Sequence, residues 1–134
     1  MGEAAAIREL GGVILYTEHF EPMRAFYVET LGLRPRGEHR EAHVDFVNFA
    51  WGDMRLTITT HADVRGRNAD PQRIMLNLSV DDIGAVYGRL REAGVEFSRP
   101  PEREGFGGWI ATFADPDGNT LQLLQDRAEP RPLR

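Results

Sequence analysis

The chain has 134 residues, no cysteine, 21 acidic residues against 16 lysines and arginines, and a net charge of −5. This length predicts one domain, and the lack of cysteine excludes disulfide bonds, thiolate metal ligands and cysteine nucleophiles. The chain has 16 arginines and no lysine, which excludes lysine-based catalysis. The acidic balance argues against a nucleic-acid partner, and no apolar run could span a membrane. Because no signal peptide is recognisable, we expect a cytoplasmic protein.

The first half of the chain predicts one helix among four strands. Residues 21–31 place apolar side chains on one helical face, and Gly32 follows as a helix-ending glycine would. Short apolar runs and apolar–polar alternation predict the strands. The strands are expected over residues 10–16, 33–39, 44–49 and 55–60.

After a polar connector, the same order begins again. Asp81 or Asp82 can cap a helix that Gly94 ends, and a loop rich in proline, glutamate and glycine is expected over residues 99–108. The second set of strands is expected over residues 73–80, from 95, over 109–114 and over 120–125. We interpret Asp115 and Asp117 as turn residues whose carboxylates accept hydrogen bonds from nearby backbone amides.

The repeated order predicts an α+β fold made of two tandem βαβββ modules. The modules are expected to form a curved mixed sheet around a cleft, with the helices on the outer face. Residue matches support the repeat, since Leu31-Gly32-Leu33 resembles Ala93-Gly94-Val95. The whole chain, 1–134, is expected to be a single domain. Its parts are module one (about 8–62), a connector (about 63–72), module two (about 73–125) and a loose C-terminal tail (126–134).

Two motifs resemble those of the vicinal oxygen chelate superfamily, which includes glyoxalase I, bleomycin-resistance proteins and extradiol dioxygenases. They are Phe26-Tyr27-x-x-x-Leu31-Gly32-Leu33 and Asp115-Pro116-Asp117-Gly118-Asn119-x-Leu121-x-Leu123. The resemblance covers about residues 8–125. It implies that catalytic relatives hold a divalent metal in the cleft with His or Glu from four strands. It also implies a homodimer, which among relatives usually completes the cleft.

Carried over by motif spacing, the four metal-binding positions fall on Gly12, Thr57, Met75 and Gln122. Hard divalent cations prefer carboxylate and imidazole donors, and none of these four residues supplies one. We therefore expect no family metal site and no cofactor, while a metal site elsewhere stays open. The histidines are interpreted as exposed or edge residues: His19, His39, His43 and His61.

The period of two along each strand assigns one side to the helices and the other to the cleft. The cleft side carries a mixture of apolar and neutral polar residues with one arginine, which suits a small aromatic or amphipathic ligand. Trp109 is expected in the core, and residues 105–108 as a flexible lid. The predicted ligand-binding residues are Tyr16, Arg55, Thr57, Thr59, Met75, Asn77, Thr120 and Gln122.

Two classes of function remain open from the sequence. The first is a metal-free protein that binds a small molecule and does no chemistry. The second is an enzyme, either a metal-dependent lyase or dioxygenase with displaced ligands, or a metal-free isomerase or lyase. The metal-free enzyme would use Tyr16, Arg55, or a loop carboxylate such as Glu102 or Glu104. A regulatory or immunity-type interaction module is a third interpretation.

Overall fold

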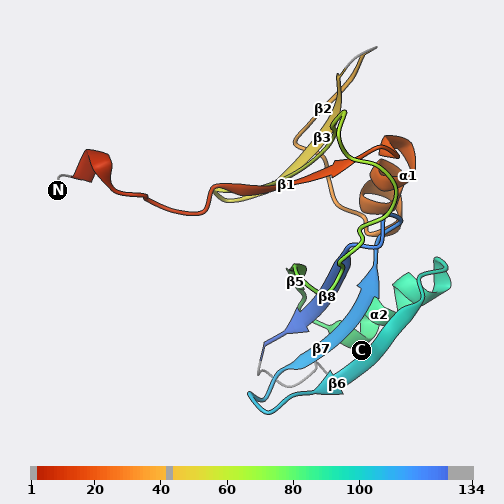
Figure 1. Cartoon of the computed structure of the whole chain (residues 1–134). Helices are drawn as coiled ribbons and strands as arrows, with labels where there is room; N and C mark the ends of the chain where they lie inside the picture. The colour runs from red at the N-terminus through yellow and green to blue at the C-terminus, as the bar shows by residue number, and fades with distance from the viewer. Residues whose placement is uncertain (1–2, 42–43, 127–134) are drawn as a thin grey trace.

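The computed structural model of the chain describes residues 3–41 and 44–126. It contains two four-stranded mixed sheets, ordered β1-β4-β3-β2 and β5-β8-β7-β6, as Figure 1 shows. Strand β1 pairs in parallel with β4, and β5 pairs in parallel with β8. The other hydrogen-bonded strand pairs are antiparallel. The predicted α+β fold of two βαβββ modules is confirmed. The predicted tail from 127 onward, and His43, lie outside the described residues.

The first module begins after an extended N-terminal segment that leads away from the body of the molecule (Figure 1). The helix predicted over 21–31 is built as α1 followed by one π-helical segment, which the bond from the Leu31 amide to the Phe26 carbonyl closes at 2.8 Å. Gly32 then turns the chain with a φ of 78°. The elements are η1 (Glu3–Ala5), β1 (Gly12–Thr17), α1 (Phe20–Ala25), η2 (Phe26–Thr30), β2 (Gly37–Glu41), β3 (Val44–Trp51) and β4 (Met54–Thr60).

The strand expected over 33–39 lies later in the chain, so that expectation is wrong in its bounds. Pairing with β3 begins at Gly37, opposite Asn48. The segment before it is held instead by Leu33, whose amide bonds to the carbonyl of Tyr27 at 3.0 Å at the end of the helix. The start of the segment that the sequence pattern assigned to a strand is therefore part of the end of the helix.

The second module repeats the order with a regular helix. Asp82 caps that helix, because its carboxylate accepts the Ala85 amide at 3.0 Å. Gly94 ends the helix region with a φ of 96°. The elements are β5 (Met75–Ser79), α2 (Ile83–Glu92), β6 (Phe97–Arg103), β7 (Trp109–Ala114) and β8 (Thr120–Gln125).

The loop expected over residues 99–108 is wrong in its first half, which belongs to β6. Proline cannot donate a ladder hydrogen bond and is tolerated in strands mainly at edges and bulges. Strand β6 is an edge strand, and its register against β7 shifts between Arg99 and Glu102. Pro100 and Pro101 fall inside that shift, so the two prolines are accommodated without ending the strand.

One apolar core joins both modules. Of the strand residues expected to face the helices, those of β4 and β8 are buried, with exposed fractions of 5% at Leu56, 0% at Ile58 and Leu121 and 2% at Leu123. Those of β1 and β5 are partly buried: Val13, Leu15, Leu76 and Leu78. The buried residues form one cluster with residues of α1 and α2, and Trp109 packs against it as expected. The opposite side of each sheet lies outside this core. Among the described residues, no helix is long and apolar enough to cross a membrane.

Candidate functional site

We call the side of each sheet that faces away from the helices its inner face. On the first sheet, the strand register brings four predicted ligand-binding residues onto this face. Tyr16 and Thr59 are direct neighbours on β1 and β4, and Arg55 and Thr57 follow along β4. Tyr16 keeps 43% of its surface exposed, and its ring meets the ring of His61 edge-on at 4.9 Å. The face is therefore aromatic at one end and cationic at the other.

The inner face of the second sheet carries the other four predicted residues. Met75 lies beside Thr120, and Asn77 lies beside Gln122. The Gln122 side-chain amide donates to the Asn77 side-chain oxygen at 2.7 Å, which leaves the second donor and acceptor of this pair exposed. The Thr120 hydroxyl instead donates to the carbonyl of Pro71, and Thr120 is only 9% exposed. Of the four, Thr120 is thus the least available to a ligand.

Sequence reasoning predicted the third strand of each module but missed the residues that it places on the inner face. Register places Phe46 and Asn48 of β3 opposite Thr59 and Thr57, and Thr112 of β7 opposite Gln122. The Asn48 side-chain oxygen is buried and has no hydrogen-bond partner among the described residues. The signal was present, because Asn48 and Thr112 each lie between two apolar residues in a strand.

The eight predicted residues form two groups of four, one on each sheet. Among the described residues, no hydrogen-bonded strand pair joins the two sheets. A cavity of about 560 Å³ lies between the modules, and Arg55 and Asn77 are the only predicted residues that line it. We call this cavity the inter-module crevice; its apolar lining includes Val13, Leu31, Leu33, Leu76, Leu78 and Val86.

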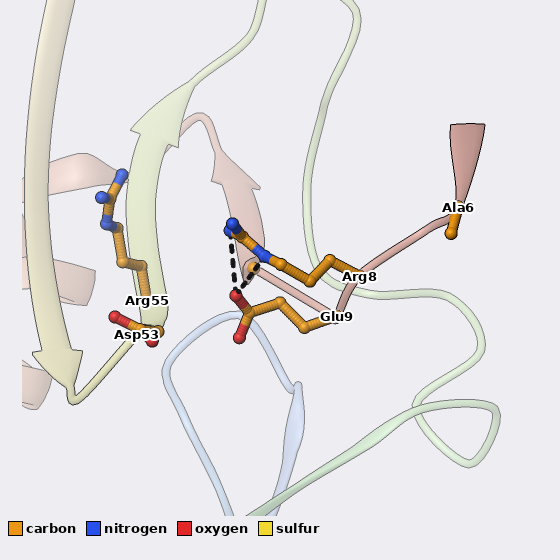
Figure 2. Close-up of a pocket in the computed structure, with 6 residues that line it drawn as sticks. Ala6, Arg8, Glu9, Asp53 and Arg55 are labelled. Atoms are coloured by element: carbon orange, nitrogen blue, oxygen red, sulfur yellow. Dashed lines mark hydrogen bonds and ion pairs between the residues drawn. The ribbon is translucent and has the colours of Figure 1, made fainter. Parts of the chain in front are cut away.

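A wider and more polar groove, of about 950 Å³, lies where the N-terminal segment meets β4. Figure 2 shows Arg8 and Glu9 paired with each other across one side, 3.0 Å apart. Asp53 and Arg55 lie on the other side. Charges of both signs line this groove, so it has no preference for a ligand of either charge.

The four family metal positions do not fit a divalent cation in this fold. A Cβ atom at Gly12 would lie 2.7 Å from the carbonyl oxygen of Arg55, so the backbone leaves no room for a side-chain ligand there. Thr57, Met75 and Gln122 offer neither carboxylate nor imidazole. Within residues 3–41 and 44–126, no three His, Asp or Glu side chains are grouped so that they could hold a metal ion.

The carboxylate of Asp115 is the most heavily bonded polar group of the structure. It accepts the amides of Asp117 and Asn119 at 2.9 and 3.0 Å, and the Asn119 side chain at 2.9 Å. It also accepts the hydroxyl of Tyr27, from the other module, at 2.7 Å. The turn role expected for Asp115 is confirmed, and the bond to Tyr27 adds a link between modules that sequence reasoning missed.

Burial is the main influence on the pKa values of Tyr27 and Asp115. It raises the pKa of the Tyr27 hydroxyl well above its usual range, and the neighbouring Asp115 carboxylate raises it further. Burial also raises the pKa of Asp115, although the hydrogen bonds from Asn119 and Tyr27 act in the opposite direction. Tyr27 is fully buried and Asp115 is 4% exposed. The pair is therefore closed to a ligand and serves the junction between the modules.

A sequence profile of the Glyoxalase/Bleomycin resistance protein/Dioxygenase superfamily matches residues 9–123, which include both modules. The chain belongs to this superfamily. The uncharacterized protein YetH of Bacillus subtilis (strain 168) is 27% identical over 122 residues, covering 89% of this chain and 99% of that protein.

Solved structures agree with this assignment. TnmS3, an antibiotic binding protein from Streptomyces sp. CB03234, is 28% identical with a TM-score of 0.71, covering 90% of this chain and 98% of that one. A superfamily member from Sphaerobacter thermophilus DSM 20745 is 25% identical with a TM-score of 0.68, covering 90% of this chain and 98% of that one.

Proposed function

We propose that this superfamily member binds a small aromatic or amphipathic molecule on its inner faces without a metal ion. The observation that carries the proposal is the state of the four family metal positions, where Gly12 has no room for a side chain and the other three are poor ligands. The aromatic and amide groups on the same faces supply stacking surface and neutral hydrogen bonds. The likeness to TnmS3, an antibiotic binding protein, supports a binding role.

A second copy of the chain would complete this site. Ile14, Tyr16 and Met75 are 53%, 43% and 44% exposed on the inner faces, and Leu10 just before β1 is 71% exposed. Apolar side chains gathered at one surface mark an interaction site. We propose that a homodimer covers them and encloses the ligand, with the two modules acting as one domain in the cytoplasm.

The enzyme alternative has less support from the geometry. Glu102 and Glu104, the loop carboxylates considered as bases, both accept hydrogen bonds from Arg99. Their charge is therefore compensated by Arg99. The register places Arg99 opposite Thr112, so this compensated group lies on the inner-face side of the second sheet. A metal enzyme with displaced ligands would need a group of donors, and the described residues hold none.

Binding and metal content test the proposal together. We expect the purified protein to carry no stoichiometric Ni, Zn, Fe or Mn after dialysis. We expect 1-naphthol, a neutral aromatic probe, to raise the melting temperature and Gln122→Leu to weaken that effect severalfold. Asp53→Asn, in an exposed turn, is the matched control and should bind as the parent does. A tightly held metal ion, or a probe response that Gln122→Leu leaves unchanged, would contradict the proposal.

A further inference from the structure

The inter-module crevice has the size and lining of a ligand site, and Arg55 and Asn77 are the only predicted ligand-binding residues of the inner faces that also line it. Its volume of about 560 Å³ is within the usual range for small-molecule pockets. Val13 and Leu33 line it from the first module, and Leu78 and Val86 line it from the second. Both walls are aliphatic, so the crevice favours a flexible hydrocarbon over a polar molecule.

The charges at the crevice are of one sign. Arg55 and Arg89 line it, and no Asp or Glu of the described chain does. This is unexpected for a chain with 21 acidic residues and a net charge of −5. The groove beside it, in Figure 2, differs because Glu9 and Asp53 line it together with Arg8 and Arg55, although neither carboxylate forms an ion pair with Arg55 among the described residues. The crevice therefore combines an apolar interior with positive charge.

Neither arginine is neutralised by a carboxylate within the described residues. Arg89 donates to the carbonyl oxygens of Thr30 and Leu31 at 3.0 and 3.1 Å, and these are neutral acceptors. These bonds fix the guanidinium beside Leu31, which itself lines the crevice. An arginine has five N–H donors, so donors remain for an anion. Arg55 forms no ion pair with any residue that the structure describes.

We propose that the inter-module crevice binds an apolar carboxylate, with its hydrocarbon between the two aliphatic walls and its carboxylate at Arg55 and Arg89. This inference goes beyond the proposed function, because the ligand is charged and the site shares only Arg55 and Asn77 with the predicted ligand-binding residues of the inner faces. Arginine is suited to the task, since its planar guanidinium matches the geometry of a carboxylate. Each methylene group that enters the crevice should tighten binding about fourfold until the cavity is full.

Titration with decanoate and its neutral analogue 1-decanol tests the assignment. Trp51 lines the crevice, so its fluorescence should report binding. We expect saturable 1:1 binding of decanoate to the full-length protein, about tenfold tighter than 1-decanol. Arg55→Gln should weaken decanoate binding about fivefold to tenfold and leave 1-decanol unchanged. Equal affinity for the two probes, or an Arg55→Gln variant that binds decanoate as the parent does, would overturn the proposal.

Three variants distinguish binding in the crevice from binding elsewhere on the molecule. Val86→Phe should fill the crevice and abolish decanoate binding, whereas Ala85→Phe, on the exposed side of the same helix, should not. Circular dichroism and melting of each variant verify folding. Gln122→Leu, on the inner face, should leave decanoate binding intact even if it abolishes 1-naphthol binding. Unchanged decanoate binding by a folded Val86→Phe variant would place the probe elsewhere and overturn the proposal.

The extended segment of a second copy is the competing occupant of the crevice. Ile7 and Leu10 are 96% and 71% exposed, so the segment has apolar side chains to offer. A variant lacking residues 1–10 distinguishes the two cases. Unchanged decanoate affinity in this variant supports the proposal. If decanoate binds only after the deletion, the crevice belongs to a protein segment and the proposal is wrong.

Discussion

The turn between β3 and β4 and the turn between β7 and β8 occupy equivalent places in the two modules but have opposite surroundings. The first is short and exposed, with Trp51 49% exposed beside Gly52 and Asp53. The second is buried, with Asp115 and Asp117 each 4% exposed. The two modules thus share their strand order but differ in the surroundings of this turn.

The partners of the buried turn explain the difference. The connector between the modules crosses it, where Arg67 donates to the carbonyl of Pro116 at 2.8 Å and the Asn68 amide to that of Asp117 at 2.7 Å. Tyr27 reaches it from the first module. The second turn therefore holds the modules together, whereas the first turn borders the inter-module crevice through Trp51. Substitutions at equivalent positions of the two turns should therefore destabilise the protein by different amounts.

The largest expected effect comes from removing the buried carboxylate. Asp115→Ala leaves the Tyr27 hydroxyl and the amides of Asp117 and Asn119 without an acceptor, so we expect a loss of about 3 kcal/mol in the free energy of unfolding. Asp53→Ala in the exposed turn should cost less than about 0.5 kcal/mol. Urea denaturation of both variants measures the contrast. Equal losses would show that the buried turn has no special role.

Removing only the link between the modules should cost less. Tyr27→Phe deletes the hydroxyl that bonds to Asp115 and leaves the three bonds within the turn intact. We expect a loss of about 1.5 kcal/mol in the free energy of unfolding at neutral pH. Tyr87→Phe on α2, whose hydroxyl accepts only a long bond from Arg91 at 3.4 Å, is the control and should lose little. Urea denaturation again provides the measurement.

The same tyrosine predicts a loss of stability at alkaline pH. An unfolded tyrosine ionises with a pKa of about 10, whereas burial and Asp115 raise the pKa of folded Tyr27 well above that value. The folded chain thus keeps a proton that the unfolded chain releases, and the free energy of unfolding falls as the pH rises above about 10. One such group contributes at most about 1.4 kcal/mol per pH unit.

Urea denaturation of the parent and Tyr27→Phe between pH 8 and pH 11 measures this loss. The chain has no lysine, so lysine deprotonation does not obscure it. The stability advantage of the parent should be constant up to about pH 10 and then shrink. An advantage that stays constant to pH 11 would contradict the assigned burial of the Tyr27 hydroxyl.

The smallest expected contrast is between the glycines of the two turns. Gly52 and Gly118 both have positive φ, 60° and 83°, so alanine should cost about 1 kcal/mol of backbone strain at either. At Gly52 a Cβ would meet nothing within 4 Å, whereas at Gly118 it would lie 2.9 Å from the Arg67 guanidinium. Gly118→Ala should therefore melt at a lower temperature than Gly52→Ala. Identical melting temperatures would mean that Arg67 moves aside without cost.

Much of the fold could be predicted from local patterns. The alternation of Leu56 and Ile58 with polar residues identified the buried side of β4, and the aspartate before Ile83 identified the start of α2. A prediction from local sequence failed where a contact with a strand distant in the sequence overrode it. Pro100 and Pro101 predicted a loop, but the register shift against β7 accommodates them in an edge strand.

The candidate site was predicted only in part, for a geometric reason. Strand alternation gives the side on which Thr57 or Gln122 lies, and the register confirms that they lie beside Ile14 and Asn77. Alternation does not say how two sheets are placed, because no local pattern encodes the angle between modules. The crevice that Arg55 and Asn77 also line was therefore invisible in the sequence.

The sequence by itself determined the duplicated βαβββ order, the faces of its helices and strands, and the lack of metal ligands at the family positions. These follow from residue type and from periods of two and 3.6, which act over a few neighbours. Only the tertiary structure decided that Tyr27 bonds to Asp115, 88 residues away, and that an apolar crevice with two arginines opens between the modules. Such features depend on how complete elements pack, and packing brings together residues that share no local pattern.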